Sequence, residues 1–402
     1  MKFLHCSDLH LGKKPYFGSE IFKNRRFEDY FNAFGRIIEQ AKENNADAIF
    51  VAGDFFDKKE THPNILSNTE NLLQKCKNYK IQVVVIEGNH DSIYKNRESE
   101  SWIIYLEEKG LLKRPFIEFL EEEEKRKYHS ISIGGVEIFG LGYPGAFVDE
   151  ELRVFADYCE ENGKRNCIVI VHTSVGNNEF IGGFLKDKGI LDRMKDFATY
   201  IAGGHGHKLY KYPEIDPVFF VPGSPEYYDF GENPEFKTAI LFDTNSKEHK
   251  IINQNPRNCI TDSMTLQSAN PEQFREEFDK FLSLLDISSE DIVILTVESF
   301  ATDFIPDTNW ATKRILEKGA LHAEVKWKRG NSQFNYSSVN KNSQEEIELE
   351  QIKKWQKWSG VAEITAKALV EMRKSVKEGQ SDISSIFEAV LNSVIGGKNE
   401  DK

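Results

Sequence analysis

Potential metal ligands follow five short apolar segments of the chain. The segments KFLHCS, AIFVAG, VVVIEG, CIVIV and TYIAGG are each typical of a β-strand, and a histidine, aspartate or asparagine comes directly after each one. Imidazole nitrogen, with carboxylate and amide oxygen but without thiolate, suits manganese, iron, zinc or magnesium ions. The predicted metal ligands are Asp8, His10, Asp54, Asn89, His172, His205 and His207.

These residues lie far apart in the sequence, but the elements before them can bring them together. In open α/β sheets, ligands collect at the carboxyl ends of the strands, so five such ends could converge on one crevice. Alternate residues of an extended segment point to the same side, so Asp8 and His10 can reach one ion or two adjacent ions. His205 and His207 have the same spacing. Because Asp54 can bridge two ions about 3.5–4 Å apart, the pattern predicts a two-metal hydrolytic centre.

Each motif alone also has an ordinary structural explanation. An Asp-x-His pair is common, Asn89-His90-Asp91 could form a turn, and His172 could be a hydrogen-bonded core histidine. The joint occurrence of the motifs, always after a strand-like segment, favours the metal site.

The wider pattern predicts a layered α/β fold. Up to about residue 245, strand-like segments alternate with helical patterns near 25–44 and 64–78, and several later strands are separated only by a turn. Part of the sheet is therefore expected to be antiparallel or to form a second sheet, giving a two-layer or sandwich-like core. Residues 1–257 are expected to form this domain.

Three further segments follow the first domain. Residues 258–330 have the pattern of a small β-α-β-α-β unit, and residues 331–345 are rich in Asn, Ser and Gln, which predicts a linker. Residues 346–396 have the pattern of amphipathic helices, whose apolar face must dock on the body or on a partner.

The bulk composition limits the class of protein. With 402 residues, 39% of them hydrophobic and 29% charged, the chain is expected to be a soluble globular protein of two or three domains. Its net charge of −13 argues against coating of nucleic acid by bulk electrostatics, although carboxylates that hold cations also count as negative. Five scattered cysteines indicate neither a disulfide framework nor a thiolate zinc site. We find no signal-peptide pattern and no apolar run that could cross a bilayer, and we therefore expect a cytoplasmic protein.

The complete set of motifs is Asp8-x-His10, Gly53-Asp54, Gly88-Asn89-His90-Asp91, His172 and Gly204-His205-Gly206-His207. This set resembles the signature of the calcineurin-like metallophosphoesterases. Within that superfamily, the segments HCSDLHLGK, GDFFD and VPGSPEYYDFGE are similar to the SbcD-type nucleases, the catalytic subunits of a DNA double-strand-break repair nuclease and ATPase complex. By motif the resemblance covers about residues 1–245, and beyond them only the layout of cap, tether and helices matches.

The resemblance implies a calcineurin-like layered β-sandwich flanked by helices, with a small α/β capping domain and a C-terminal helical tail. It implies one metal ion on Asp8, His10, Asp54 and His207 and a second on Asp54, Asn89, His172 and His205, with manganese as the usual ion. His90 is expected to orient the phosphate or protonate the leaving oxygen, with Asp91 as its orienting partner. The implied activity is that of an exonuclease on duplex ends and an endonuclease on single strands or hairpins.

The resemblance also implies partners. These are DNA, an SbcC-type coiled-coil ATPase bound through residues 346–396, and a second copy of the chain in a homodimer, with no membrane. Cations near the metal motifs and in the cap are expected to contact DNA, namely Lys13, Lys14, Lys208, Lys328 and Arg329. One departure concerns Tyr227 and Tyr228, near which many relatives carry a basic residue. Tyrosines there could stack on bases or pack between strands.

Two other functions are compatible with the sequence. A phosphatase or cyclic-nucleotide phosphodiesterase of the same superfamily would use the same ligands on a small phosphodiester or a phosphoprotein. A scaffold would hold an ATPase dimer through residues 346–396, with cleavage secondary or lost. The cap and the tethered helices favour the nuclease, because an enzyme for small substrates does not need them, and every ligand type required for cleavage is present.

Overall fold

The computed structural model describes residues 1–92, 101–120, 125–176, 182–232, 236–266, 270–299 and 304–329. Residues 1–330 form one compact unit. The predicted linker at 331–345 and the predicted helical segment at 346–396 lie outside the described residues.

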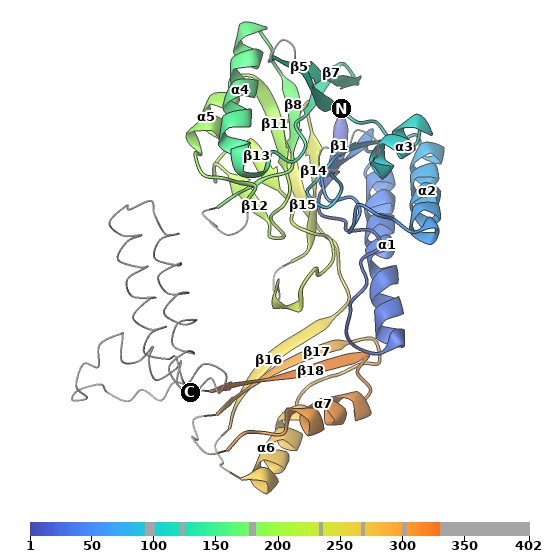
Figure 1. The fold of residues 1–402 in the computed structure, drawn as a ribbon, viewed down its shortest axis with the longest axis vertical. Helices are drawn as coiled ribbons and strands as arrows, with labels where there is room; N and C mark the ends of the chain where they lie inside the picture. Colours follow the sequence, from blue (N-terminus) through green and yellow to red (C-terminus); the bar gives the residue numbers. More distant parts are fainter. Residues whose placement is uncertain are drawn as a thin grey trace, which may run out of the picture. The chain divides into compact units, whose positions relative to one another are not determined.

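The first sheet has five strands in the order β15-β14-β1-β2-β3 (Figure 1). Strands β1 (Lys2–Cys6), β2 (Ala48–Ala52) and β3 (Gln82–Ile86) are parallel, whereas β14 (Thr238–Asp243) and β15 (His249–Asn253) continue the sheet with antiparallel pairing. Helices α1 (Glu20–Glu43), α2 (Pro63–Asn78) and α3 (Trp102–Glu108) cover one face and bury an apolar core that includes Phe34, Ile49 and Leu73. Strand β2 is buried along its whole length, as expected for a parallel strand covered on both faces.

The second sheet has six strands in the order β12-β13-β11-β8-β7-β6. Strands β7 (Val136–Gly140), β8 (Cys167–Val171), β11 (Ala198–Gly203) and β13 (Phe219–Val221) are parallel, and β6 (Ile131–Ile133) and β12 (Tyr210–Tyr212) are antiparallel edges. Helices α4 (Val148–Glu161) and α5 (Gly189–Met194) cover its outer face. Smaller elements are the pairs β4 (Phe116–Leu120) with β5 (Lys125–His129) and β9 (Ser174–Val175) with β10 (Phe184–Leu185), and the 3-10 turns Gly145–Phe147 and Phe230–Glu232.

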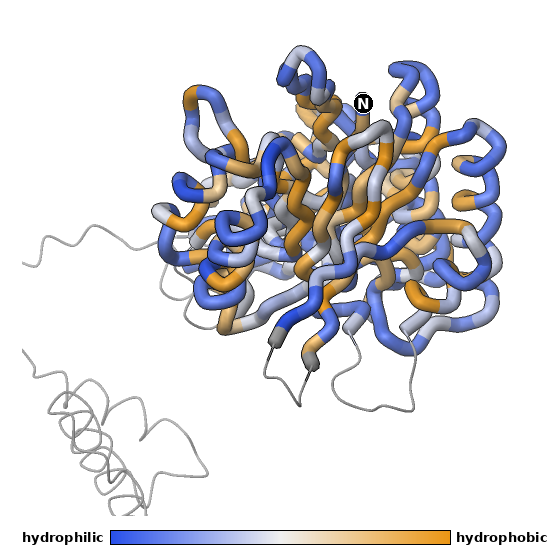
Figure 2. Tube along the Cα trace, turned by 90° about the horizontal axis from the view of Figure 1, so that it is seen from above, coloured by the Kyte–Doolittle hydropathy of each residue, from blue (hydrophilic) through white to orange (hydrophobic). Residues whose placement is uncertain are grey.

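The two sheets pack face to face through a second apolar core. Phe3, Phe50, Ile168 and Tyr200 belong to this core, and the ring centroids of Phe3 and Phe50 are 4.3 Å apart. Figure 2 shows hydrophobic residues along the central strands and hydrophilic residues on the surrounding helices and turns. The result is a four-layer sandwich of helices, sheet, sheet and helices, so the predicted layered α/β class with a partly antiparallel, second sheet is confirmed.

A smaller α/β region, the cap, follows the sandwich. Strands β16 (Cys259–Leu266), β17 (Ile292–Ser299) and β18 (His322–Arg329) form a parallel sheet, and α6 (Pro271–Ser283) and α7 (Thr308–Glu317) connect them in the predicted β-α-β-α-β order. The helices cover one face through Phe278, Leu295 and Ile315. The opposite face of the cap sheet contacts the start of α1. There the rings of Phe22 and His322 stack with centroids 4.0 Å apart.

Two expectations drawn from composition can be compared with the described residues. All five cysteines are buried and free, and none of them pairs with another in a disulfide bond. No helix in the described ranges has both the length and the apolar character needed to cross a membrane.

Candidate metal centre

The carboxyl ends of five strands bring the seven predicted ligands together. Asp8 and His10 follow β1, Asp54 follows β2 and Asn89 follows β3, all in the first sheet. The second sheet supplies His172 after β8, and His205 and His207 after β11. Because the two sheets face each other, the loops from both meet at one edge of the sandwich.

The backbone at the centre adopts conformations that side chains rarely tolerate. Left-handed φ angles occur at four of the predicted ligands, namely Asp8 (54°), His10 (44°), Asp54 (50°) and His205 (69°). Each such residue costs about 1–3 kcal/mol and persists only where its surroundings fix it. Here the amide of Asp8 donates to the carbonyl of Gly53, and the amide of His10 donates to the carbonyl of Asp54. Strain of this kind is common at functional sites.

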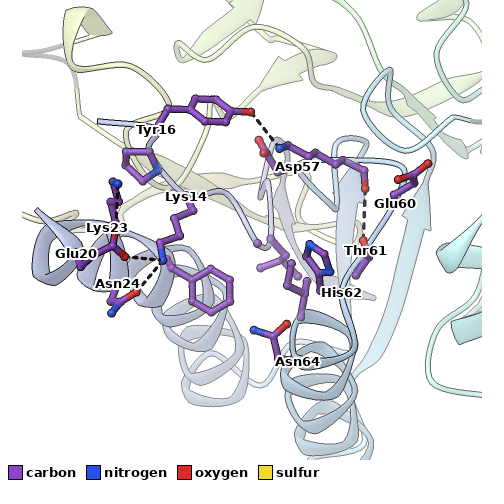
Figure 3. Close-up of a pocket in the computed structure, with 16 residues that line it drawn as sticks. Lys14, Tyr16, Glu20, Lys23, Asn24, Asp57, Glu60, Thr61, His62 and Asn64 are labelled. Carbon is purple, nitrogen blue, oxygen red and sulfur yellow. Dashed lines mark hydrogen bonds and ion pairs between the residues drawn. The ribbon is translucent and has the colours of Figure 1, made fainter. Parts of the chain in front are cut away.

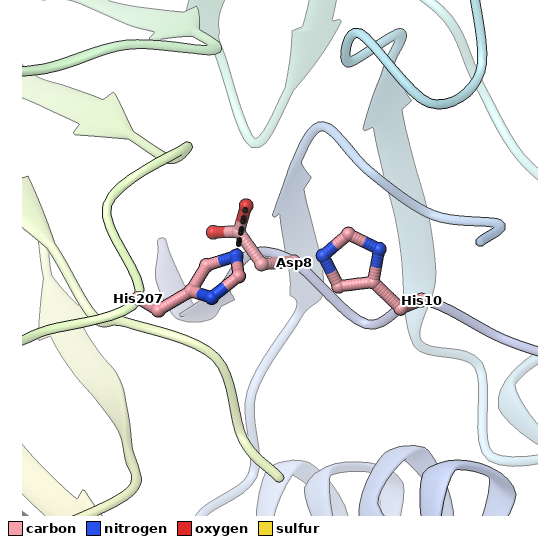
Figure 4. A group of neighbouring side chains, drawn as sticks. All are labelled: Asp8, His10 and His207. Atoms are coloured by element: carbon pink, nitrogen blue, oxygen red, sulfur yellow. Dashed lines mark ion pairs between the residues drawn. The ribbon is translucent and has the colours of Figure 1, made fainter. Parts of the chain in front are cut away.

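One group of potential ligands consists of Asp8, His10 and His207, whose ligand atoms lie within 4.8 Å of one another (Figure 4). His207 Nε2 is 3.9 Å from Asp8 Oδ1. Both ring nitrogens of His10 are buried without a hydrogen-bond partner. A buried imidazole normally has a partner, so the unsatisfied His10 fits a site that a cation would complete.

A second group contains Asp54 and His172, again with Asp8 within 4.8 Å. His172 Nε2 lies 3.3 Å from Asp54 Oδ2 and 3.1 Å from Asn89 Oδ1. His205 Nδ1 lies 3.1 Å from the same Asn89 oxygen. Asn89 thus links the two histidines, and the two groups share Asp8.

Each of three histidines is oriented by a hydrogen bond that points away from the centre. His172 Nδ1 donates to the carbonyl of Ala52 at 2.7 Å, and His205 Nε2 donates to the carbonyl of Gly182 at 2.9 Å. His207 Nδ1 bonds to Glu232 Oε1 at 2.6 Å. In each ring the other nitrogen is left for the centre, as in histidines that bind metals.

Burial and neighbouring charges set the pKa values of these groups. Burial opposes ionisation of Asp54, but the adjacent His172 outweighs it and holds the pKa of the carboxyl well below its usual range. Burial also opposes protonation of His172, yet the Asp54 carboxylate raises its pKa to about 9. Burial is the main reason that the pKa of His10 lies well below its usual value, and the nearby His207 and His90 lower it further although Asp54 opposes the shift. A cation at this position would take the place of a proton as the partner of the Asp54 carboxylate.

The expected contact between His90 and Asp91 does not form. The Asp91 carboxylate accepts hydrogen bonds from the backbone amides of Phe55, Phe56 and Gly88, and it is buried. Burial and the Asp54 charge raise its pKa to about 7. His90 Nδ1 bonds instead to the carbonyl of Asp57 at 2.7 Å. Asp91 therefore fixes the loops that carry Asp54 and Asn89, and Asp57 orients His90.

Glu232 is a functional candidate that the sequence did not reveal. Besides His207 it accepts hydrogen bonds from Lys237 Nζ at 2.5 Å and from the amide of Tyr228 at 3.1 Å. It lies in the quoted segment VPGSPEYYDFGE, but nothing in the local pattern shows that it reaches His207 across the fold. Its position is that of a residue that orients a ligand from outside the centre.

Tyr228 covers the centre on the side of the first group. Its ring centroid lies 4.4 Å from that of His10 and 4.9 Å from that of His207. Lys13 Nζ lies 3.1 Å from the centroid of the Tyr228 ring and 3.6 Å from Asp57 Oδ1. Lys13 thus places a cation beside the predicted ligands. Tyr227, in contrast, is buried in an apolar cluster with cap residues such as Ile292.

The other predicted DNA-contacting cations lie at the surface. Lys14 bonds to Asn24 at 2.9 Å, and Lys208 is exposed directly after His207. Lys328 and Arg329 are exposed at the end of β18, where Lys328 Nζ is 3.3 Å from Glu298. The structure places them on two regions, the rim of the centre and the cap.

The four-layer sandwich and the donor set at its edge define the metallophosphoesterase class. Residues 1–209, just over half of the chain, match the calcineurin-like phosphoesterase family. The chain belongs to this family, as its motifs predicted.

Relatives of known name extend over more of the chain. The DNA double-strand break repair protein Mre11 of Methanosarcina acetivorans is 35% identical over 335 residues, which cover 81% of this chain and 50% of that protein. The protein of the same name from Methanosarcina mazei is 36% identical over 336 residues, covering 81% and 49%. That of Archaeoglobus fulgidus is 26% identical over 349 residues, covering 82% and 74%. The chain thus spans about half the length of the two Methanosarcina proteins. The three names agree with the predicted resemblance to break-repair nucleases.

Proposed function

We propose that the chain is a two-metal DNA nuclease that acts in double-strand-break repair. The observation that carries the proposal is the donor set, in which Asp54 lies 3.8 Å from His10 of one group and 3.3 Å from His172 of the other, and three histidines each present one nitrogen to the centre. The family is one of phosphoesterases, and the relatives are named for DNA break repair. A DNA phosphodiester is the substrate that joins these findings.

Two manganese ions would be held in the arrangement that the resemblance implies. Asp8, His10, Asp54 and His207 would hold one ion, and Asp54, Asn89, His172 and His205 the other. Asp54 suits the shared position, because its Oδ2 lies 3.8 Å from His10 Nε2 and 3.3 Å from His172 Nε2. The donors are nitrogen and oxygen without sulfur, a set that manganese accepts. When bound, such ions neutralise charge on the phosphoryl oxygens and activate water for in-line attack.

His90 is the residue that we assign to the phosphate itself. Its Nδ1 donates to the Asp57 carbonyl, which leaves Nε2 for substrate. The His90 ring lies 4.8 Å from the His10 ring, centroid to centroid, at the side of the first group. In its protonated form Nε2 would donate to a phosphate oxygen or to the leaving oxygen. Asp91 would act only by holding the loop.

The same reasoning gives the substrate and the partners. Lys13, Lys14 and Lys208 would meet DNA phosphates at the rim of the centre, and Lys328 and Arg329 would meet them on the cap. Duplex ends would be cut as by an exonuclease, and single strands or hairpins as by an endonuclease. An SbcC-type ATPase would bind residues 346–396, which lie outside the described residues, and two copies of the chain would form a dimer.

The test is cleavage of end-labelled duplex and hairpin DNA with added manganese. The parent chain is compared with Asp54→Ala, His90→Ala and the control His129→Ala. His129 is a partly exposed histidine of β5 paired with Glu118, away from the centre. We expect manganese-dependent cutting by the parent and the control, with at least a hundredfold loss in the other two, on the order expected for an acid-base residue.

A small phosphodiester without a base, assayed with the same proteins, separates the alternatives. Hydrolysis of this compound without cutting of DNA would reject the nuclease and leave the phosphatase-like enzyme. If neither substrate is hydrolysed under any divalent ion, a scaffold is the better description.

A further inference from the structure

Large apolar side chains are exposed directly after the first metal motif. Tyr16 is 85% exposed and Phe17 is 52% exposed, within ten residues of Asp8 and His10. Exposed aromatic residues that gather beside a catalytic edge are more informative than scattered ones, because such patches commonly bind ligands. The surface around Tyr16 and Phe17 is therefore a candidate ligand-binding site.

Both residues line a hollow of about 370 Å³ between the Tyr228 loop and cap strand β18. Its volume lies within the range of small-ligand sites. Six of its thirteen lining residues are aromatic, and four cations, Lys13, Lys14, Arg26 and Lys326, face only two carboxylates, Asp229 and Glu324. Each of these cations is paired with a carboxylate, Lys13 with Asp57, Lys14 with Glu20, Arg26 with Asp29 and Glu226, and Lys326 with Glu324. The hollow thus combines flat apolar walls with polar, ion-paired groups at its rim.

A second hollow, of about 560 Å³, shares Lys14, Pro15 and Tyr16 with the first as lining residues. Figure 3 shows the residues that line this second hollow. There the three lysines are balanced by three carboxylates, and Lys14 is bonded to Asn24 and paired with Glu20. Of these two hollows, the one beside Tyr228 has the more aromatic lining, with six aromatic residues against Tyr16 and Phe27 in its neighbour. It is therefore the better site for a ligand that is flat.

Tyr228 joins this hollow to the metal centre. Its ring contacts His10 and His207, and it also lines the hollow, with Lys13 over the ring. A nucleotide whose phosphate lies at the centre therefore has the hollow directly beside it. A base can enter only when it is not paired, because a paired base is held by its partner strand and by stacking within the duplex.

We propose that the hollow lined by Tyr16, Phe17, Tyr228 and Phe230 holds an unpaired base of the strand whose phosphate lies at the metal centre. The proposal rests on the proposed nuclease function and narrows its substrate to a strand with at least one unpaired nucleotide beside the cut. Aromatic walls accept any base, because every base has a π face. Lys326, on the cap, would meet the adjoining phosphate.

The test compares two DNA ligands that differ only in their bases. Both are duplexes with a short single-stranded overhang, and in one ligand the overhang consists of abasic residues. Binding to the full chain with manganese is measured by fluorescence anisotropy, and both ligands carry phosphorothioate linkages that resist cleavage. We expect the ordinary overhang to bind roughly fivefold or more tightly than the abasic one, in line with the effect of losing one stacked base.

The variant Phe17→Ala should lose this preference, and the control Phe119→Ala should keep it. Phe119 is similarly exposed, at 56%, but lies on β4. Because Phe17 also contacts Phe22 and Phe230, a second variant, Lys326→Ala, changes the wall without removing an aromatic ring. It should weaken binding of both overhangs and reduce the salt dependence of binding.

Failure of the base site and failure of the nuclease function would give different results. An equal preference for bases in the parent and in Phe17→Ala would overturn the base site, even if the parent cuts DNA with manganese. A parent chain that neither binds nor cuts any DNA would overturn the nuclease and the base site together.

Discussion

Glu232 shows how one residue outside the predicted ligand set can control the centre. Its carboxylate holds His207 Nδ1 at 2.6 Å and so fixes which nitrogen faces Asp8. The variant Glu232→Gln keeps the size of the side chain but removes its charge. We expect manganese to bind roughly tenfold more weakly, at the lower end of the effect of such orienting residues.

Titration calorimetry with manganese measures this change. The control Glu248→Gln removes an exposed carboxylate from the turn before β15 and should bind as the parent does. An unchanged affinity of Glu232→Gln, with an unchanged melting temperature, would show that His207 needs no such support.

His5 gives a prediction on pH at the same scale. It is fully buried in β1, where its ring nitrogens bond to Tyr200 and to the carbonyl of Gly203. Burial lowers its pKa to about 3, whereas the unfolded chain keeps a value near 6.5. Between these values the unfolded state binds the extra proton, so stability is full above pH 6.5 and is lost as the pH falls toward 3.

From pH 7 to pH 5 this linkage costs about 2 kcal/mol. Urea unfolding of the parent and of His5→Phe at both pH values measures it. The parent should lose about 2 kcal/mol more than the variant over this interval. Equal losses would mean that His5 is protonated in the folded chain.

At the scale of elements, Arg26 connects helix α1 to the loop that carries Tyr228. Its guanidinium is buried and donates to Asp29 at 2.9 Å, to Glu226 at 3.0 Å and to the Tyr227 carbonyl at 2.7 Å. Replacing it by methionine leaves the buried Glu226 without its main partner and removes one of the two arginine partners of Asp29, which costs about 3–5 kcal/mol. The neighbouring Arg25 is the matched control, because it is half exposed and paired with Glu28 at 3.3 Å.

Denaturant unfolding should show a loss of about 3–5 kcal/mol for Arg26→Met and of at most about 1 kcal/mol for Arg25→Met. If the two variants lose similar amounts of stability, the buried network around Arg26 contributes no more to stability than a surface ion pair does.

The elements also show what the sequence could predict. A strand and the ligand that follows it are consecutive, so Asp54 after AIFVAG and His172 after CIVIV could be recognised one by one. The partners of Asp91 and Glu232 depend on contacts between separate loops, and no local pattern contains them. Asp91 adjoins His90 in sequence, yet the turn directs its carboxylate to backbone amides.

The helices were predicted less completely than the strands. Helix α1 begins at Glu20, five residues before the pattern indicates, because the hydroxyl of Ser19 accepts a hydrogen bond from the Phe22 amide and caps it. Phe22 lies in this additional part of the helix, and its ring contacts the cap there. The contact between the sandwich and the cap therefore depends on a capping residue that hydrophobic periodicity does not show.

At the scale of the whole molecule, binding of an ion at the metal centre can stabilise the cap only through contacts between the cap and the sandwich. The cap has its own apolar core. Arg257, just before β16, links it to α1, because it pairs with Glu290 of the cap and donates two hydrogen bonds of 2.8 Å to Asp29 on α1. Asp29 in turn pairs with Arg26, whose other partners belong to the Tyr228 loop. An ion bound at the centre stabilises the sandwich by about 2.7 kcal/mol at a hundred times its dissociation constant. The network and the Phe22 to His322 stack should pass part of this stabilisation to the cap.

Hydrogen exchange with and without manganese tests this coupling. In the parent, the amides of β17 should become better protected on adding manganese, together with those of β1 and β2, because both regions then open less often. In Arg257→Ala the gain in protection on adding manganese should remain in β1 and β2 but disappear in β17. This variant removes the ion pair with Asp29 and changes no predicted metal ligand. If β17 in the parent does not respond to manganese while β1 does, the cap opens independently. It could then present DNA to the centre without sensing whether the metals are bound.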